Sequence, residues 1–213
     1  MRRFANRSQA GVELGATLAR ECAEQVAAGD VVVLGLPRGG VPVARSASRA
    51  IDAPSDIIVV RKLGVPGRAE LAMGAIASGG FTVLNRDLID ELRIPDDSIA
   101  VVLASESAEL ERRESLYRAG GPGPNLDGMA VVVVDDGAAT GATMRVAIEA
   151  VRARGPRFVC AAAPVASADA VSRLRKAADN VVVVATPEPF RAVGYWYDDF
   201  SQTTDDEVIR LLS

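Results

Sequence analysis

Residues 131–143 constrain the fold of this 213-residue chain more than any other stretch of its sequence. Four consecutive valines are followed by Asp135 and Asp136, and then by a run of small residues that holds two threonines. An unbroken run of valine is typical of a parallel strand that is covered on both faces. Because an amphipathic pattern follows at 144–154, the segment predicts a buried strand, a turn and the start of a helix.

The loop after the two aspartates suits a phosphate that carries a sugar. Its residues with little or no side chain are Gly137, Ala138, Ala139, Gly141 and Ala142. Backbone N–H groups of such residues can approach an anion closely, and a helix start adds the positive end of its dipole. The hydroxyls of Thr140 and Thr143 can donate to the same anion. Asp135 and Asp136 repel a phosphate, so they suit sugar hydroxyls or a cation.

This pattern resembles the phosphoribosyl-pyrophosphate (PRPP) signature of the type I phosphoribosyltransferases. The resemblance implies an α/β fold with a doubly wound, mostly parallel sheet, flanking helices and a small hood. It implies that residues 135–143 bind the ribose and 5′-phosphate of PRPP. Asp135 and Asp136 would hold the ribose hydroxyls directly or through Mg²⁺, and Asp136 is the candidate catalytic base. The alternative is an ordinary strand–turn–helix unit with an acidic turn.

A second glycine-rich stretch, residues 35–41, follows the predicted strand at 31–36. It resembles the pyrophosphate-binding loop of the same family, in which a basic residue precedes Gly-Gly. The residues that this resemblance assigns to pyrophosphate are Pro37, Arg38, Gly39 and Gly40. In that family a cis peptide bond precedes the basic residue, so the bond expected here is Pro37–Arg38. The alternative is a Gly-Gly turn with a solvated arginine.

Arg61 and Lys62 follow the predicted strand at 57–60. Carboxyl ends of parallel strands lie at one edge of a sheet, so these two cations are expected beside both loops as further pyrophosphate ligands. The alternative is a solvated pair of charges at a strand end.

Aromatic residues concentrate in residues 186–202, beyond the last predicted strand. The resemblance implies that an acceptor base packs against a ring in a hood beyond the PRPP site. The candidate residues for the acceptor are Phe190, Tyr195, Trp196 and Tyr197, with Asp198 or Asp199 as hydrogen-bond acceptor. The alternative is that these rings form a small satellite core or a dimer interface, because aromatic side chains dominate both.

Strands and helices alternate along the chain, which favours a parallel sheet with helices on both faces. Strands are predicted at 31–36, 57–60, 74–80, 81–84, 131–134, 158–163 and 181–184. Helices are predicted at 6–28, 41–51, 85–92, 96–118, 141–154 and 168–178, and from a capping box at 204–207 to 212. Residues 120–128 are expected to form a loop. One domain, 1–213, is predicted, with a hood built from 186–213, from N-terminal segments, or from both.

Composition excludes several functions. The chain has no histidine, which removes Ser-His-Asp and Cys-His catalysis and the common zinc sites. A net charge of −4 disfavours general nucleic-acid binding. No apolar run approaches the roughly 20 residues that span a bilayer, and no secretory signal is recognised at the start. A cytoplasmic protein is therefore expected, with Cys22 and Cys160 as isolated, buried free thiols.

Arg112, Arg113 and Arg118 precede the predicted loop at 120–128. The i,i+4 spacing pairs Glu109 with Arg113 and Glu114 with Arg118. A solvated helix face is therefore predicted for these arginines, in preference to a catalytic role.

The predicted function is Mg²⁺-dependent displacement of pyrophosphate from PRPP by a small nitrogenous, nucleobase-like acceptor, as part of nucleotide metabolism. The family implies a homodimer. Two alternatives remain open. One is a sensor of PRPP or a nucleotide without transferase activity, and the other is a phosphoribosyl-ester hydrolase that uses water as acceptor.

Overall fold

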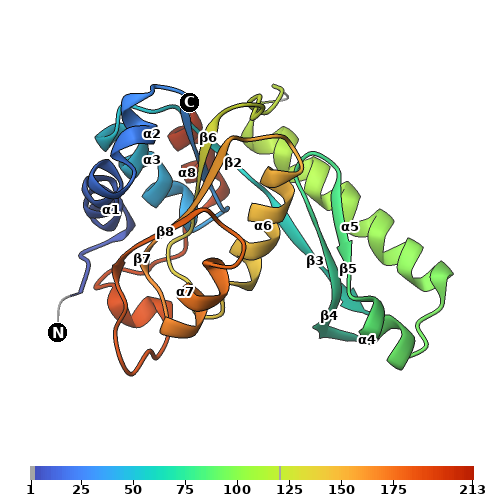
Figure 1. The fold of residues 1–213 in the computed structure, drawn as a ribbon. Helices are drawn as coiled ribbons and strands as arrows, with labels where there is room; N and C mark the ends of the chain where they lie inside the picture. Colours follow the sequence, from blue (N-terminus) through green and yellow to red (C-terminus); the bar gives the residue numbers. More distant parts are fainter. Residues whose placement is uncertain (1–2, 120) are drawn as a thin grey trace.

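The computed structural model describes residues 3–119 and 121–213. It contains a five-stranded parallel sheet in the order β2-β1-β6-β7-β8 and a three-stranded antiparallel sheet in the order β3-β4-β5. The parallel strands are β1 (Val31–Gly35), β2 (Ser55–Ile57), β6 (Ala130–Val134), β7 (Phe158–Val165) and β8 (Asn180–Ala185). The predicted mostly parallel α/β sheet is therefore confirmed (Figure 1).

Helices cover both faces of the parallel sheet. They are α1 (Arg7–Glu21) and α3 (Gly40–Ala50) on one face, and α6 (Ala142–Arg152) and α7 (Ala168–Leu174) on the other. Alternate residues of a strand point to opposite faces. Val132 and Val134 accordingly pack with α1 and α3, whereas Val131 and Val133 pack with α6 and α7. The valine run is thus explained by burial on both faces.

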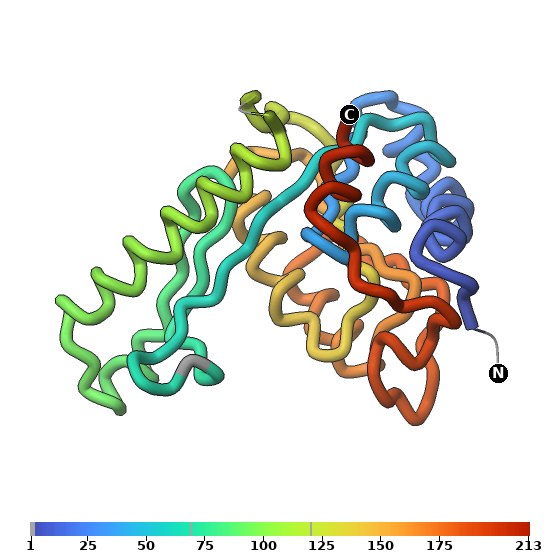
Figure 2. Tube along the Cα trace, turned by 180° about the vertical axis from the view of Figure 1, so that it is seen from behind, coloured from blue at the N-terminus to red at the C-terminus, as the bar shows by residue number. Residues whose placement is uncertain are grey.

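The antiparallel sheet forms a separate arm. Its strands are β3 (Val60–Val65), β4 (Arg68–Ala77) and β5 (Phe81–Leu84), followed by α4 (Arg86–Glu91) and α5 (Asp96–Tyr117). Figure 2 shows these elements projecting from the parallel sheet. Leu63 of β3 and Met73 of β4 belong to a hydrophobic cluster with residues of α5. Ala75 and Ala77 of β4 belong to the cluster that contains the buried residues of α6. The arm sheet therefore lies between α5 and α6.

Several predicted boundaries were wrong, among them that of the strand predicted at 74–80, which begins at Arg68 and ends at Ala77. The apolar run at 57–60 is the end of β2 and the start of β3, because Ile58 donates to the Gly35 carbonyl whereas Val59 donates to the Ser78 hydroxyl. A hydrophobic run alone does not reveal which sheet each of its residues joins. The helix predicted at 6–28 is interrupted at Cys22, which has φ −122° and ψ 32°, and continues as α2 (Ala23–Ala27).

The N-terminal segment lies beside residues 196–198 of the C-terminal segment. The Phe4 N–H donates to the Trp196 carbonyl over 2.8 Å, and the Asp198 N–H donates to the Phe4 carbonyl over 2.8 Å. The 3-10 helix η1 (Val193–Trp196) lies in this C-terminal segment, and α8 (Asp205–Leu212) follows it. The predicted cap of α8 is present, because the Thr204 hydroxyl accepts from the Glu207 N–H over 3.2 Å.

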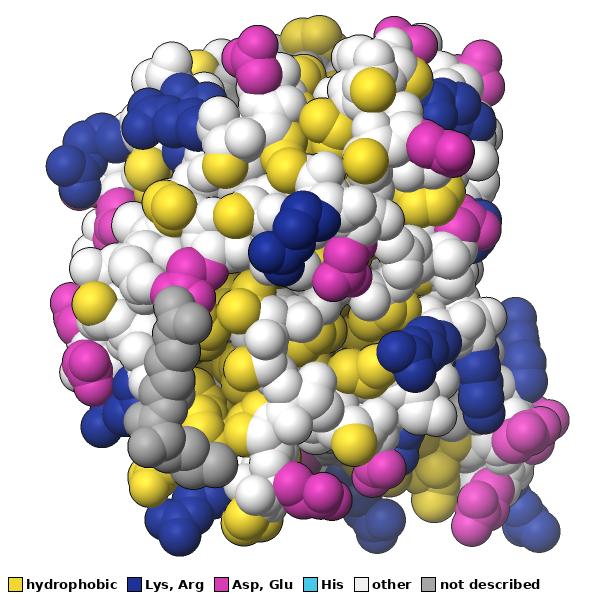
Figure 3. Space-filling view, turned by 60° about the vertical axis from the view of Figure 1, so that its left-hand side comes forward, with side chains coloured by type: hydrophobic (Ala, Val, Ile, Leu, Met, Phe, Trp, Pro, Cys, Tyr) yellow, Lys and Arg dark blue, Asp and Glu magenta, His cyan; other side chains and the backbone are white. Residues whose placement is uncertain are grey.

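On the face seen in Figure 3, basic and acidic side chains are interspersed, and hydrophobic side chains line a hollow in its lower half. Within the described part of the chain, no helix combines the length and the apolar character needed to cross a membrane.

Candidate functional site

The two glycine-rich loops meet at the carboxyl ends of neighbouring strands. β1 and β6 pair in parallel with Gly35 opposite Val134, and the Leu36 N–H donates to the Val134 carbonyl over 2.8 Å. The peptide bond Pro37–Arg38 is cis, as expected. Because adjacent strands deliver both loops to one edge, residues 36–40 and 135–141 form a single surface.

Glycine is required where these loops touch. A Cβ at Gly39 would overlap the Asp136 carboxylate, with the Asp136 Cγ only 2.8 Å away. A Cβ at Gly40 would lie 2.7 Å from the Val134 carbonyl oxygen and 3.0 Å from the Asp135 Cα. Contacts this short force a shift of backbone or carboxylate, so the Gly-Gly pair permits the approach of the first loop to the acidic pair.

The acidic pair is held in a poorly solvated position. Burial, followed by the neighbouring Asp136 charge, raises the pKa of Asp135 well above its ordinary value. Burial also raises the pKa of Asp136, although Arg7 opposes that shift. The Asp136 N–H donates to the Asp135 carboxylate over 2.9 Å. Carboxylates with raised pKa values that face a loop are typical of functional sites.

Arg7 is a further candidate site residue, which the sequence did not reveal. Its Nε lies 2.8 Å from the Asp136 carboxylate, and the two side chains are only 12% and 16% exposed. Its Nη1 donates to the Ser201 carbonyl over 2.6 Å, and its guanidinium lies 4.0 Å from the centroid of the Phe200 ring. Arg7 and Asp136 are 129 residues apart, so local sequence carries no signal for this pair.

The C-terminal segment also supports the acidic loop. The Tyr197 hydroxyl donates to the Asp136 carbonyl over 2.5 Å. A Cβ at Gly137 would lie 2.5 Å from a methyl group of Val193. Residues 193–197 therefore fix the backbone position of the loop at Asp136 and Gly137.

Only part of the predicted phosphate loop is open. Gly137 and Ala138 are buried, and the Ala138 N–H already donates to the Val165 carbonyl over 2.9 Å. Ala139, Thr140 and Ala142 are exposed, and Gly141 has φ 70°, a left-handed conformation that favours glycine. The surface that can receive a phosphate is therefore residues 139–143 with the N-terminus of α6.

Arg38, in the middle of the glycine-rich loop 36–40, lies near the C-terminal helix. Its Nη1 is 3.7 Å from the carboxylate of Asp205, in the first turn of α8. Both side chains are partly exposed, at 34% and 44%, so the guanidinium is accessible to an anion. The ion pair is long and screened by water, which makes it a weak competitor for such an anion.

Arg61 and Lys62 lie in β3, not after a parallel strand as predicted, and they point to opposite faces of the arm. The Arg61 guanidinium pairs with Glu106 of α5 over 2.6 Å. Lys62 shares a cavity of about 330 Å³ with Thr143 and Arg145 at the start of α6. The structure therefore places Lys62 beside the phosphate loop but directs Arg61 toward α5.

The predicted acceptor residues form a small hydrophobic cluster. Trp196 and Tyr197 are buried with Phe4, and Phe190 packs against them. Tyr195 is 46% exposed, with the Arg191 guanidinium 4.9 Å from its ring centroid. Asp198 is exposed and pairs with Arg3 over 3.1 Å. The satellite-core interpretation therefore describes Trp196 and Tyr197, whereas Tyr195 and Asp198 face solvent.

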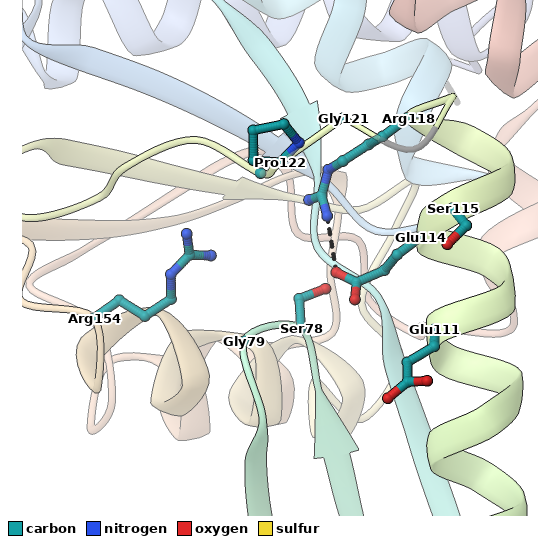
Figure 4. Close-up of a pocket in the computed structure, with 10 residues that line it drawn as sticks. Ser78, Gly79, Glu111, Glu114, Ser115, Arg118, Gly121, Pro122 and Arg154 are labelled. Carbon is teal, nitrogen blue, oxygen red and sulfur yellow. Dashed lines mark hydrogen bonds and ion pairs between the residues drawn. The ribbon is translucent and has the colours of Figure 1, made fainter.

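A larger cavity, of about 370 Å³, lies at the other end of α6 (Figure 4). Arg118, Glu111 and Glu114 line it on the α5 side, and Arg154 lies across from them. The Arg118 guanidinium is already bonded to Asp56 over 3.0 Å, to Glu114 over 2.8 Å and to the Ile57 carbonyl. With its side chain 10% exposed, Arg118 is not on a solvated face as predicted; it joins α5 to β2. Gly120, the first residue of the loop predicted at 120–128, lies outside the described residues.

A family model described as "Phosphoribosyl transferase domain" matches residues 67–199, which include the acidic pair and the phosphate loop. The chain belongs to this family. Two provisionally named phosphoribosyl transferases of Mycobacterium tuberculosis, from strains CDC 1551 and H37Rv, are each 44% identical to it over 212 residues. The match covers all of this chain but 47% of each relative, so the chain spans about half their length.

Solved structures agree on the fold. Protein TT1426 from Thermus thermophilus is 41% identical, with a TM-score of 0.83, and the match covers 99% of this chain and 97% of that one. A Neisseria gonorrhoeae protein solved with bound ppGpp is 15% identical, with a TM-score of 0.50, and the match covers 100% and 96%. At that identity the second match shows the fold alone.

Proposed function

We propose that this phosphoribosyltransferase-family chain binds PRPP at the two glycine-rich loops and transfers its phosphoribosyl group to a nitrogenous acceptor. The observation that carries the proposal is the contact of Gly39 and Gly40 with the acidic pair. It places a candidate pyrophosphate loop directly against a candidate ribose-binding loop. Holding both parts of PRPP on one rigid edge provides the positioning on which such a displacement depends.

Each part of PRPP has a set of protein groups with suitable chemistry. The N-terminus of α6, with Thr140 and Thr143, suits the 5′-phosphate. Asp135 and Asp136 suit the ribose hydroxyls. Backbone N–H groups beside Gly39 and Gly40, together with Arg38, suit the pyrophosphate that leaves. Charge that develops on this leaving group would be neutralised by the guanidinium.

The acidic pair also suits Mg²⁺. Mg²⁺ is commonly held by one or two carboxylates together with ligand oxygens, and Asp135 and Asp136 supply two hard donors. No group of three or more acidic, histidine or cysteine side chains that could hold a metal occurs among the described residues, which fits an ion completed by PRPP itself. Bound Mg²⁺ would supply charge neutralisation at the pyrophosphate and ribose oxygens.

Arg7 acts in this proposal as a positioning residue. Burial favours the protonated form of Asp136, and the nearby guanidinium favours the carboxylate. A deprotonated Asp136 can accept from ribose hydroxyls, bind Mg²⁺ or act as the base near the acceptor. Arg7 therefore keeps Asp136 in the form that each of these roles needs.

The acceptor site is proposed at the exposed side chains of the C-terminal segment. Tyr195 offers a partly exposed ring and Asp198 an exposed carboxylate, and Phe190 lies in the same cluster. This segment touches the acidic loop through Tyr197 and Val193. A base that packs here would lie within reach of the ribose. A homodimer remains part of the proposal and is checked by light scattering.

Pyrophosphate release tests the reaction. The protein is incubated with PRPP and Mg²⁺, alone and with each of a panel of nucleobases, and pyrophosphate and nucleotide are measured together. Release that requires a base, with stoichiometric nucleotide, supports transfer. Release without a base indicates the hydrolase alternative. Tight PRPP binding without any release contradicts the transferase proposal and favours the sensor.

A further inference from the structure

The only two cysteines of the chain meet in the core, although 138 residues separate them. The Cys22 and Cys160 sulfur atoms are 3.9 Å apart, and both side chains are buried. Cys22 lies at the break between α1 and α2, and Cys160 is the third residue of β7. The thiols are free, as predicted, but they are not isolated from each other.

We propose that Cys22 and Cys160 form a redox-modification site, at which a peroxide converts the two thiols into a reversible intramolecular disulfide. A disulfide has an S–S length of about 2.05 Å, so the sulfur atoms must approach by roughly 1.9 Å. Cys22 departs from helical geometry, with φ −122° and ψ 32°, although its N–H donates to the Leu18 carbonyl over 2.8 Å and its carbonyl accepts from the Val26 N–H over 3.0 Å. Because Cys22 adjoins the short, exposed helix α2 whereas Cys160 is paired to strands on both sides, Cys22 is the partner whose movement is less restrained.

Local opening gives an oxidant access to Cys22. α2 has five residues, and none of them is buried. Short segments with little buried surface open at a small free-energy cost while the rest of the fold persists. Opening of α2 uncovers Cys22 at its start, whereas Cys160 remains between β6 and β8 in the sheet. The structure therefore gives the two cysteines different roles, one exposed on opening and one resident in the core.

The surroundings of Cys22 also activate its sulfur. The hydrogen bond with Cys160 lowers the pKa of Cys22 to about 7, and the Asn180 side-chain amide donates to the Cys22 sulfur over 3.6 Å. The same hydrogen bond and burial raise the pKa of Cys160. Because the thiolate is the nucleophile, Cys22 is the attacking residue and Cys160 the resolving one.

The chemistry balances with one peroxide. The Cys22 thiolate attacks a peroxide oxygen, the O–O bond breaks, and a sulfenic acid and water form once the leaving hydroxide takes a proton. The Cys160 sulfur then attacks the sulfenic sulfur, so that an S–S bond forms, the S–O bond breaks, and hydroxide leaves with the Cys160 proton as water. Two thiols and one hydrogen peroxide become one disulfide and two waters.

Alkylation after oxidation tests the proposal. The full chain is treated with hydrogen peroxide or with dithiothreitol, denatured without reductant, alkylated and analysed by mass spectrometry. The oxidised protein is expected to carry no alkyl group, to yield one peptide pair joining Cys22 to Cys160, and to run as a monomer on a non-reducing gel. Later dithiothreitol should restore two alkylatable thiols.

Matched variants locate the bond. Cys22→Ser and Cys160→Ser should each yield no intramolecular cross-link. Oxidation should raise the Tm of the wild type, because the bond restrains the unfolded chain, and should leave the Tm of Cys22→Ser unchanged. The Tm comparison uses only the wild type and Cys22→Ser, so the test stands even if Cys160→Ser fails to fold. Two thiols that stay alkylatable, separate sulfinic acids, or bonds only between chains would each overturn the proposal.

Discussion

The two ends of α6 differ in how their polar groups are satisfied. At the N-terminal end, the acidic pair is desolvated, residues 139–143 are open, and Arg38 has only a long, exposed ion pair. At the C-terminal end, the cavity is larger, but Arg118 is bonded to two carboxylates and a carbonyl, and Arg154 donates to the Pro124 carbonyl. Unsatisfied polar groups, and not cavity volume, therefore set the proposed PRPP site apart from the end of α6 where charged side chains are already paired.

The largest expected effect is the loss of PRPP binding when the acidic pair is neutralised. Asp135→Asn/Asp136→Asn should lower the affinity for PRPP with Mg²⁺ by at least about 100-fold, because hydrogen bonds to charged groups contribute roughly 1.5–3 kcal/mol each. Isothermal titration calorimetry measures this. Arg154→Gln, at the other end of α6, is the control and should bind PRPP as the wild type does. Equal losses of PRPP affinity in both variants would contradict the proposal that PRPP binds at the N-terminal end of α6 and not at the C-terminal end.

Arg118 should affect stability instead of binding. Arg118→Gln leaves Asp56 and Glu114 without their partner and is expected to lower the free energy of unfolding by about 2–4 kcal/mol. For a chain of this size each kcal/mol corresponds to roughly 2–4 °C in Tm. Urea unfolding measures the loss, and calorimetry with PRPP should show an unchanged Kd below the melting temperature. A large fall in PRPP affinity would make this end part of the ligand site.

Gly39→Ala tests the contact between the loops. The added methyl group overlaps the Asp136 carboxylate, and strain of about 1–3 kcal/mol is expected, which corresponds to a loss of PRPP affinity between roughly 5-fold and 150-fold. Gly121→Ala beside the remote cavity is the matched control, since its Cβ would meet only the Arg118 carbonyl oxygen at 3.2 Å. If Gly39→Ala binds PRPP normally, the loops do not act as one surface.

Arg7→Gln should weaken PRPP binding by roughly 10-fold at neutral pH, the equivalent of one charge-assisted hydrogen bond. Without the guanidinium, the pKa of Asp136 rises further, so a higher pH is needed to deprotonate it. The pH profile of PRPP affinity should therefore shift upward and approach the wild-type affinity at alkaline pH. Arg3→Gln, which removes an exposed ion pair with Asp198, is the control. A pH-independent loss would indicate a purely structural role for Arg7.

The smallest expected effect is a gain in stability. The pKa of Asp135 is raised in the folded state, so above the ordinary aspartate pKa the unfolded chain binds fewer protons than the folded chain. The free energy of unfolding therefore falls as the pH rises through this range. Asp135→Asn avoids that loss and should raise Tm at neutral pH, by about 2–4 °C if the gain is ~1 kcal/mol. The gain should vanish in strong acid. Asp136→Asn should gain less, because it leaves Arg7 unpaired. A lower Tm for Asp135→Asn would contradict the assignment of a desolvated carboxylate.

Features that depend on neighbours along the chain could be predicted from the sequence. The valine strand is buried on both faces, each glycine-rich loop follows a parallel strand, and Thr204 caps the last helix. Each rests on hydrogen bonds or side-chain alternation within a few residues, so the sequence carries the whole signal.

Features that join distant segments could not be predicted. Three such features depend on strand order and on which sheet each segment joins. They are the ion pair of Arg7 with Asp136, the contact of Cys22 with Cys160, and the opposite directions in which Arg61 and Lys62 point. The sequence by itself determined the parallel sheet and the chemistry of its loops. Only the tertiary structure decided which distant side chains come together at the candidate site, because packing free energy, unlike local conformational preference, depends on contacts between segments far apart in the chain.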